Sequence, residues 1–192
     1  MDKLNIYLIC INILGAVLDG VTAAKRRRTS HKALSVLLGI IAIAGGAPGM
    51  IIAFALCDRT ASKTNMMLRV FTVCVCVIEL AVFMTWKLRP AGKWSFAFWD
   101  VLVEYRWTLW FAAAVSVITF VMFGIDKYRA VKGGYRIPIA VLLGMAFAGG
   151  SIGALLGMVV FRHKIRKNYF SVGVPLILVM QVVLLMCVVN LL

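Results

Sequence analysis

The chain has 192 residues, of which 63% are hydrophobic and 15% are charged. Soluble domains carry roughly 45–50% apolar and about 25% charged residues, so this composition excludes an ordinary soluble fold and indicates a bilayer as the solvent. The 21 Lys and Arg outnumber the seven Asp and Glu, which gives a net charge of +14. Because the basic residues lie in short loops between apolar segments, we interpret them as loops facing an anionic leaflet and expect no nucleic acid partner.

Six apolar segments follow one another, each close to the ~20 residues that a helix needs to cross a bilayer. The first leads into Lys25-Arg26-Arg27-Arg28 and lacks a small-residue cleavage site, so we interpret it as a retained membrane helix rather than a signal peptide. The sequence therefore predicts an all-α integral membrane protein. The six segments cover roughly residues 4–22, 33–57, 70–86, 107–125, 137–161 and 170–192.

The second half of the chain repeats the pattern of the first half. Residues 12–88 align with residues 116–192 at a fixed offset of 104, without a gap. The Gly-Gly-x-x-Gly that begins at Gly45 falls on the one that begins at Gly149. We therefore predict two tandem repeats of three segments each. The predicted parts are a first, degenerate repeat (1–86), a linker (87–106) and a second repeat (107–192).

The Gly-rich middle segment of each repeat allows two geometries. In a straight helix, Gly149, Gly153 and Gly157 would line one face and let another helix approach closely, and Gly45 and Gly49 match them in the first repeat. The rival geometry is a re-entrant hairpin that turns at the Gly pair, which is allowed where protein shields the backbone. We expect straight spans, which would make the two repeats inverted relative to each other, as in many transporters.

The distribution of basic residues bears on the same choice and favours the other geometry. Straight spans divide the 21 Lys and Arg 13 to 8 between the two sides of the membrane, whereas two hairpins divide them 16 to 5. The positive-inside rule prefers the more uneven division.

Polar and basic motifs concentrate in the second half, from about residue 107 to residue 181. Together they resemble the bacterial membrane family called domain of unknown function 1294. The resemblance implies an integral protein of the bacterial cytoplasmic membrane and supplies no activity. Since the first half keeps the glycines and lacks the other motifs, we expect any site in the second repeat. The motifs are Asp126-Lys127, Arg136-Ile137-Pro138, Gly149-Gly150-x-x-Gly153 and Arg162-His163-Lys164-x-Arg166-Lys167.

The basic motifs suit an anionic ligand at the membrane edge. Arg presents a planar fork that pairs with phosphate, and Lys adds a point charge. The alternative is that these side chains only orient the chain in the bilayer, with their apolar stems in the lipid. The candidate ligand-binding residues are Asp126, Lys127, Arg129, Arg136, Arg162, His163, Lys164, Arg166 and Lys167.

Two acids of the first half lie at membrane depth. Glu79 stands in the middle of the third apolar segment, and Asp19 stands about one turn from the end of the first. A carboxylate in hydrocarbon is costly, so each should face the interior of the helix bundle and be paired or protonated. Asp19 could simply anchor a neighbouring basic loop, whereas Glu79 is the stronger candidate for a proton-linked role.

The sequence favours a non-catalytic transport, channel or lipid/anion-binding module. It shows no metal-ligand spacing and no nucleophile–base pair, so we expect no metal and no cofactor. The alternative is a membrane-embedded enzyme that acts on a phosphorylated lipid or head group. Convergence of Asp126, Arg136 and His163 on one side of the membrane would favour the enzyme. Anionic membrane lipids are the expected partners, and self-association is left open.

Overall fold

The structure, a computed structural model, describes residues 3–26, 32–57, 65–88 and 103–191. Six helical segments in these ranges are long and apolar enough to cross a membrane, as the sequence predicts. The chain is an all-α integral membrane protein. It divides into two compact units, Met1–Leu80 (unit 1) and Ala81–Leu192 (unit 2). Most of the expected linker, residues 89–102, lies outside the described residues.

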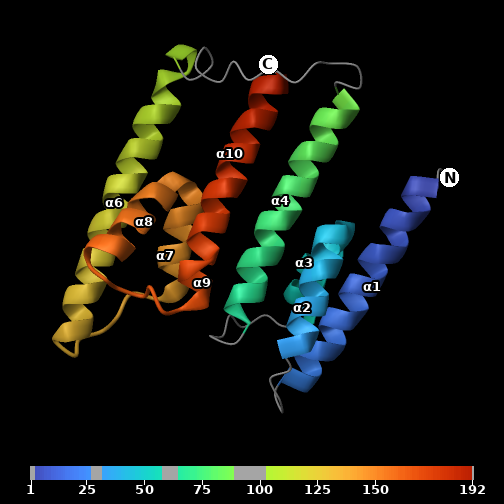
Figure 1. Ribbon diagram of the computed structural model, residues 1–192, viewed down its shortest axis with the longest axis horizontal. Helices are drawn as coiled ribbons and strands as arrows, with labels where there is room; N and C mark the ends of the chain where they lie inside the picture. The colour runs from blue at the N-terminus through green and yellow to red at the C-terminus, as the bar shows by residue number, and fades with distance from the viewer. Residues whose placement is uncertain (1–2, 27–31, 58–64, 89–102, 192) are drawn as a thin grey trace. The chain divides into compact units, whose positions relative to one another are not determined.

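Unit 1 is built from a long helix, a bent middle segment and a second long helix (Figure 1). Apolar side chains of α2, η1, α3 and α4 form its core, with Leu38, Met50 and Phe54 packed against Leu68 and Cys76. The elements are α1 (Lys3–Arg26), α2 (Lys32–Ile41), the π-helical turn η1 (Ala42–Gly46), α3 (Ala47–Cys57) and α4 (Met66–Leu88), whose last turns belong to unit 2.

Unit 2 has the same order of elements, with one extra helical turn before its last helix. In Figure 1 the α7–α8 segment reaches only part of the way along α6. The elements are α6 (Arg106–Val131), α7 (Ile139–Met145), the π-helical turn η2 (Ala146–Gly150), α8 (Ser151–Val160), α9 (Asn168–Ser171) and α10 (Gly173–Leu191).

Both middle segments break at the first glycine of the Gly pair. Gly45 has φ 103° and Gly149 has φ 114°, backbone conformations that residues with a side chain rarely adopt. The break leaves backbone carbonyls without helical partners, and polar side chains bind them. The Ser116 hydroxyl donates to the Gly149 carbonyl at 3.3 Å, and the Asn12 amide donates to the Gly45 carbonyl at 2.9 Å.

The two ends of the middle segment of unit 2 meet at one residue. A straight helix over the 22 residues Ile139–Val160 would separate its ends by about 33 Å. Instead Asp126 accepts a hydrogen bond from the Ile137 backbone N–H at 2.8 Å and contacts the His163 imidazole at 2.8 Å. These residues flank the two ends of the segment, so the segment is a re-entrant hairpin whose two ends lie at the same end of α6. The expectation of a straight middle span is therefore wrong for unit 2.

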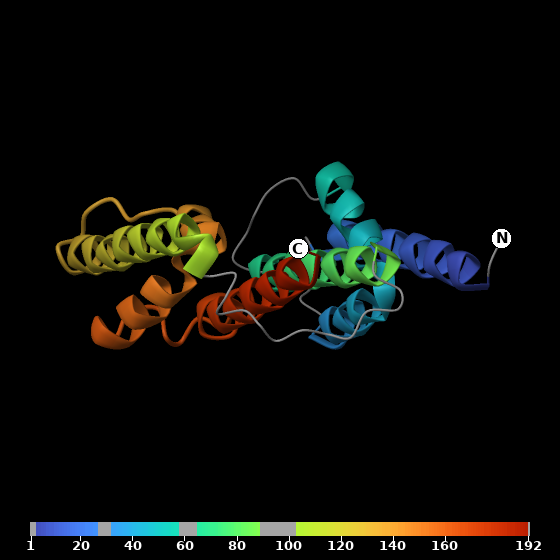
Figure 2. The same cartoon turned by 90° about the horizontal axis from the view of Figure 1, so that it is seen from above.

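The middle segment of unit 1 follows the same path. Asn12 of α1 binds the backbone of both Gly45 and Gly49 at the turn, while Gly20, further along α1, lies against Cys57 at the end of α3. Thus α3 runs beside α1 in the same direction, away from the turn. Seen from above, α2 and α3 diverge from the turn as the arms of a V (Figure 2). Because inverted repeats follow only from straight spans, that expectation loses its basis.

The glycines of the middle segments have two different roles. A Cβ at Gly153 would collide with the Ser116 carbonyl, and one at Gly157 would lie 2.8 Å from the Phe123 Cβ, so both glycines let α8 lie directly on α6. A Cβ at Gly49 would likewise collide with the Asn12 backbone. Gly149 and Gly45 instead make the turn, because of their positive φ, and do not belong to this packing stripe.

Candidate functional site

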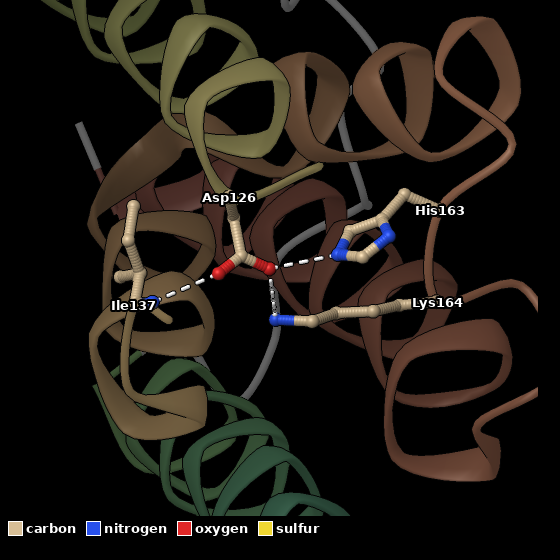
Figure 3. A network of polar contacts seen from close by, with 4 residues as sticks. All are labelled: Asp126, Ile137, His163 and Lys164. Atoms are coloured by element: carbon tan, nitrogen blue, oxygen red, sulfur yellow. Dashed lines mark hydrogen bonds and ion pairs between the residues drawn. The ribbon is translucent and has the colours of Figure 1, made fainter. Parts of the chain in front are cut away.

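Asp126 is the centre of a polar cluster at the carboxyl end of α6. It is fully buried, and its carboxylate has three partners. One oxygen accepts the Ile137 N–H, and the other lies 2.8 Å from the His163 Nε2 and 2.7 Å from the Lys164 Nζ (Figure 3). A buried carboxylate needs such partners, because an unpaired charge is strongly disfavoured away from water. Three separate chain segments are thus fastened to one side chain.

The loop after α8 has the backbone conformation that brings His163 and Lys164 to Asp126. Arg162 has φ 44° and Lys164 has φ 62°, which are strained values for residues with a Cβ. Backbone hydrogen bonds hold the loop: among them, the His163 N–H donates to the Met158 carbonyl and the Lys167 N–H to the Lys164 carbonyl. Strain of this kind persists only where surrounding contacts compensate for it, and the Asp126 contacts do so.

Aromatic rings form the apolar wall of the cluster. The Lys164 ammonium lies 4.9 Å from the centre of the Phe170 ring, on which it makes a cation–π contact. Phe170 in turn packs edge-on against Phe123, one helical turn before Asp126, with ring centres 5.6 Å apart. Lys164 is therefore held between a carboxylate and a ring, and its side chain is only 15% exposed.

The remaining basic residues of this end point outward. Residues 127–136 and 162–167 contain eight Lys and Arg, and Asp126 is the one acid in or beside them. The other acid of 103–191, Glu104, precedes α6 and is separated from Asp126 by the length of that helix. Asp126 is already neutralised by Lys164, so the exposed surface of this end is cationic. Its exposed basic residues are Arg129, Lys132, Arg136, Arg162, Arg166 and Lys167, with Lys127 half-buried.

The structure thus brings together some of the predicted site residues and leaves others at the rim. Asp126, His163 and Lys164 touch, whereas Arg136 lies next to the Ile137 amide with its own side chain exposed. Figure 3 shows the second imidazole nitrogen of His163 pointing away from Asp126. Within the described ranges, no three His, Cys, Asp or Glu lie close enough together to hold a metal ion.

The two acids that the sequence places at membrane depth, Asp19 and Glu79, lie in unit 1 and not in the Asp126 cluster. Asp19 is buried in α1, where the Thr22 hydroxyl donates to its backbone carbonyl at 2.8 Å. Glu79 lies in α4, with its carboxylate within hydrogen-bonding reach of the Gly45 backbone amide. Most of the basic loop at 25–32 and the basic residues at 59 and 63 lie outside the described residues.

Sequence reasoning overlooked the polar residues that bind the turns. In unit 2, Gln181 of α10 donates to the Ala146 carbonyl at 2.8 Å and to the Phe147 carbonyl at 3.1 Å, and Ser151 donates to Gln181. The available signal was an amide in the middle of a largely apolar segment, since a polar group at membrane depth must find a partner.

A comparison with known families matches the part of the chain that holds this cluster. The family model described as "Protein of unknown function (DUF1294)" matches residues 116–170, which include Asp126, His163 and Lys164. The chain is also 38% identical over 71 residues to the uncharacterized protein YsdA of Bacillus subtilis (strain 168), an alignment that covers 37% of this chain and 80% of YsdA. The chain belongs to the DUF1294 family. No solved structure is similar to it.

The DUF1294 match begins at Ser116, which binds the turn, and ends at Phe170, which covers Lys164. The matched stretch therefore contains the re-entrant segment and the whole Asp126 cluster. It leaves out all of α10 and all of unit 1.

Proposed function

We propose that the protein is a non-catalytic membrane module that binds the phosphate of anionic lipids at the basic end of unit 2. The observation that carries the proposal is the Asp126 cluster. By binding Ile137 on one side and His163 and Lys164 on the other, Asp126 holds two basic segments at the same end of α6. In a straight span those segments would lie on opposite sides of the membrane.

Charge and depth both support a lipid ligand. Ser116 binds the turn and lies ten residues before Asp126, so the turn is about 15 Å from the basic end, roughly half the thickness of a bilayer core. The basic end then lies at headgroup level. Arg side chains in this position can pair with phosphate in a forked geometry, and basic residues near an anionic leaflet contribute about 1 kcal/mol each.

Thermal unfolding of the purified, delipidated protein in detergent tests the proposal. A ligand that binds only the folded state raises the unfolding temperature by mass action, so phosphatidylglycerol should raise it and phosphatidylcholine should not. The pair Arg136→Gln and Arg166→Gln should abolish that increase. Arg106→Gln, which removes one positive charge at the other end of α6, is the control and should preserve the increase. Equal stabilisation by both lipids would contradict the proposal.

Phosphoester chemistry at the same end is a second candidate. Asp126, Arg136 and His163 lie at one end of α6, the convergence that favours an enzyme, and the His163 ring gives a second observation. Asp126 contacts the His163 ring through Nε2, and the Nδ1, which points away from Asp126, is the nitrogen that would accept a proton as a general base. Release of phosphate or of a headgroup from reconstituted anionic lipids would be the assay. Activity that His163→Gln abolishes without changing lipid-dependent stabilisation would support the enzyme, and its absence in the parent protein would exclude it for the lipids used.

A further inference from the structure

The last helix of each unit brings a different kind of polar side chain to the re-entrant turn. In unit 2 the side chain is the neutral amide of Gln181, which donates to the Ala146 and Phe147 carbonyls and accepts from Ser151. All the donors and acceptors of this arrangement are uncharged. A re-entrant turn at membrane depth is therefore fully held without an ionisable group.

In unit 1 the carbonyls of the turn are bound by α1. The Tyr7 hydroxyl donates to the Ala44 carbonyl at 2.8 Å, and the Asn12 amide donates to the Gly45 carbonyl at 2.9 Å. The Asn12 Oδ1 also accepts the Gly49 N–H at 2.7 Å. What α4 adds is a carboxyl group: Glu79 reaches the Gly45 amide, and its Oε1 is buried without a hydrogen-bond partner.

The surroundings of Glu79 do not favour a negative charge. On α4 the nearest basic residues are Arg69 and Lys87, ten and eight positions away, or about 15 Å and 12 Å along the helix axis. The segment facing it, residues 33–57, contains no charged residue, and α1 presents the Tyr7 phenol and the Asn12 amide at the level of the turn. The titratable group nearest on its own helix is the Cys76 thiol, which supplies no positive charge.

We propose that Glu79 is a proton-binding site at the tip of the re-entrant segment of unit 1. A protonated carboxyl can accept an N–H of the turn through one oxygen and carry its proton on the other. A Gln at this position would serve the turn equally well, so the acid adds an exchangeable proton about halfway along a membrane helix. The site lies in unit 1, and it does not depend on the lipid site proposed for unit 2.

Labelling with dicyclohexylcarbodiimide tests the proposal on the full chain in phosphatidylcholine vesicles. This apolar reagent adds a protonated carboxyl across one of its C=N bonds: the acid proton goes to nitrogen, and the carboxylate oxygen bonds to carbon. Peptide mass spectrometry should locate the label on Glu79 and not on the exposed Glu104. Labelling should fall at least tenfold as the pH is raised from 6 to 9, because deprotonation removes the protonated carboxyl that reacts with the reagent.

Two variants and one competitor complete the experiment. Glu79→Gln should fold with normal yield and lose the label, and Glu79→Asp keeps the acid if the Gln variant does not fold. Sodium ions should not protect Glu79. The proposal is overturned if the parent protein is unlabelled at Glu79, if labelling does not change with pH, or if sodium protects it, which would indicate a cation site instead.

Discussion

At the scale of single residues, Asp126 holds three separate parts of unit 2 together. One carboxylate joins the end of α6, the start of the α7 segment and the loop after α8. A surface ion pair is worth little, but removing one partner of a buried pair leaves an uncompensated charge. The strained loop at Arg162 and Lys164 depends on the same contacts. The loss of Asp126 should therefore destabilise both ends of the re-entrant segment.

We expect Asp126→Asn to lower the free energy of unfolding by about 3 kcal/mol, the low end of the range for broken buried pairs. The Asn oxygen can still accept the Ile137 N–H, so the loss arises from the Lys164 ammonium, whose side chain is 15% exposed. Lys164→Met keeps the stem against Phe170 and removes that charge. The double variant should therefore recover part of the loss in thermal unfolding. Additive effects of the two substitutions would argue against a pair that acts as a unit.

At the scale of elements, the close contact of α8 with α6 depends on glycine at position 153. A Cβ there would collide with the Ser116 carbonyl, which cannot move without shifting α6. Gly153→Ala should therefore cost about 1–3 kcal/mol, as overpacking does. Gly144→Ala is the matched control in the same segment, because nothing lies within 4 Å of its Cβ position and the residue is exposed. Unfolding temperatures of the two variants in one detergent compare them. Similar unfolding temperatures would mean that α6 and α8 leave room for a Cβ at position 153.

The turn of unit 2 gives a separate prediction, because it requires glycine at position 149 for its backbone conformation and not for lack of space. At Gly149 a Cβ meets little, the nearest atom being the Ala112 Cα at 3.9 Å, but φ is 114°. Gly149→Ala should cost roughly 1–2 kcal/mol through backbone strain alone. Gly149→Asn should cost less, since Asn tolerates positive φ better. Equilibrium unfolding of the two variants measures the difference, and the reverse order would contradict a strained turn.

At the scale of the whole molecule, the sequence predicted the six apolar segments, the glycines and the polar residues of the Asp126 cluster. It did not predict that the middle segments turn back. Periodicity cannot distinguish the two geometries, because the spacing of Gly149, Gly153 and Gly157 fits a continuous helix as well as a broken one. The break is decided by contacts distant in sequence: Ser116 and Gln181 bind the carbonyls that it releases, and Asp126 holds its ends. The uneven charge division did favour this outcome.

The re-entrant path also predicts which side of the membrane each loop faces. Positions 136 and 166 flank the α7–α8 segment, and Asp126 holds their neighbours together, so both should face the same side. Position 104 precedes the full length of α6 and should face the opposite side. In a variant with the five cysteines replaced, Arg136→Cys and Arg166→Cys should react with a membrane-impermeant maleimide from one side of sealed vesicles, and Glu104→Cys from the other. Labelling of positions 136 and 166 from opposite sides would contradict the re-entrant path and support a straight span. Labelling of all three from one side would mean that α6 does not cross.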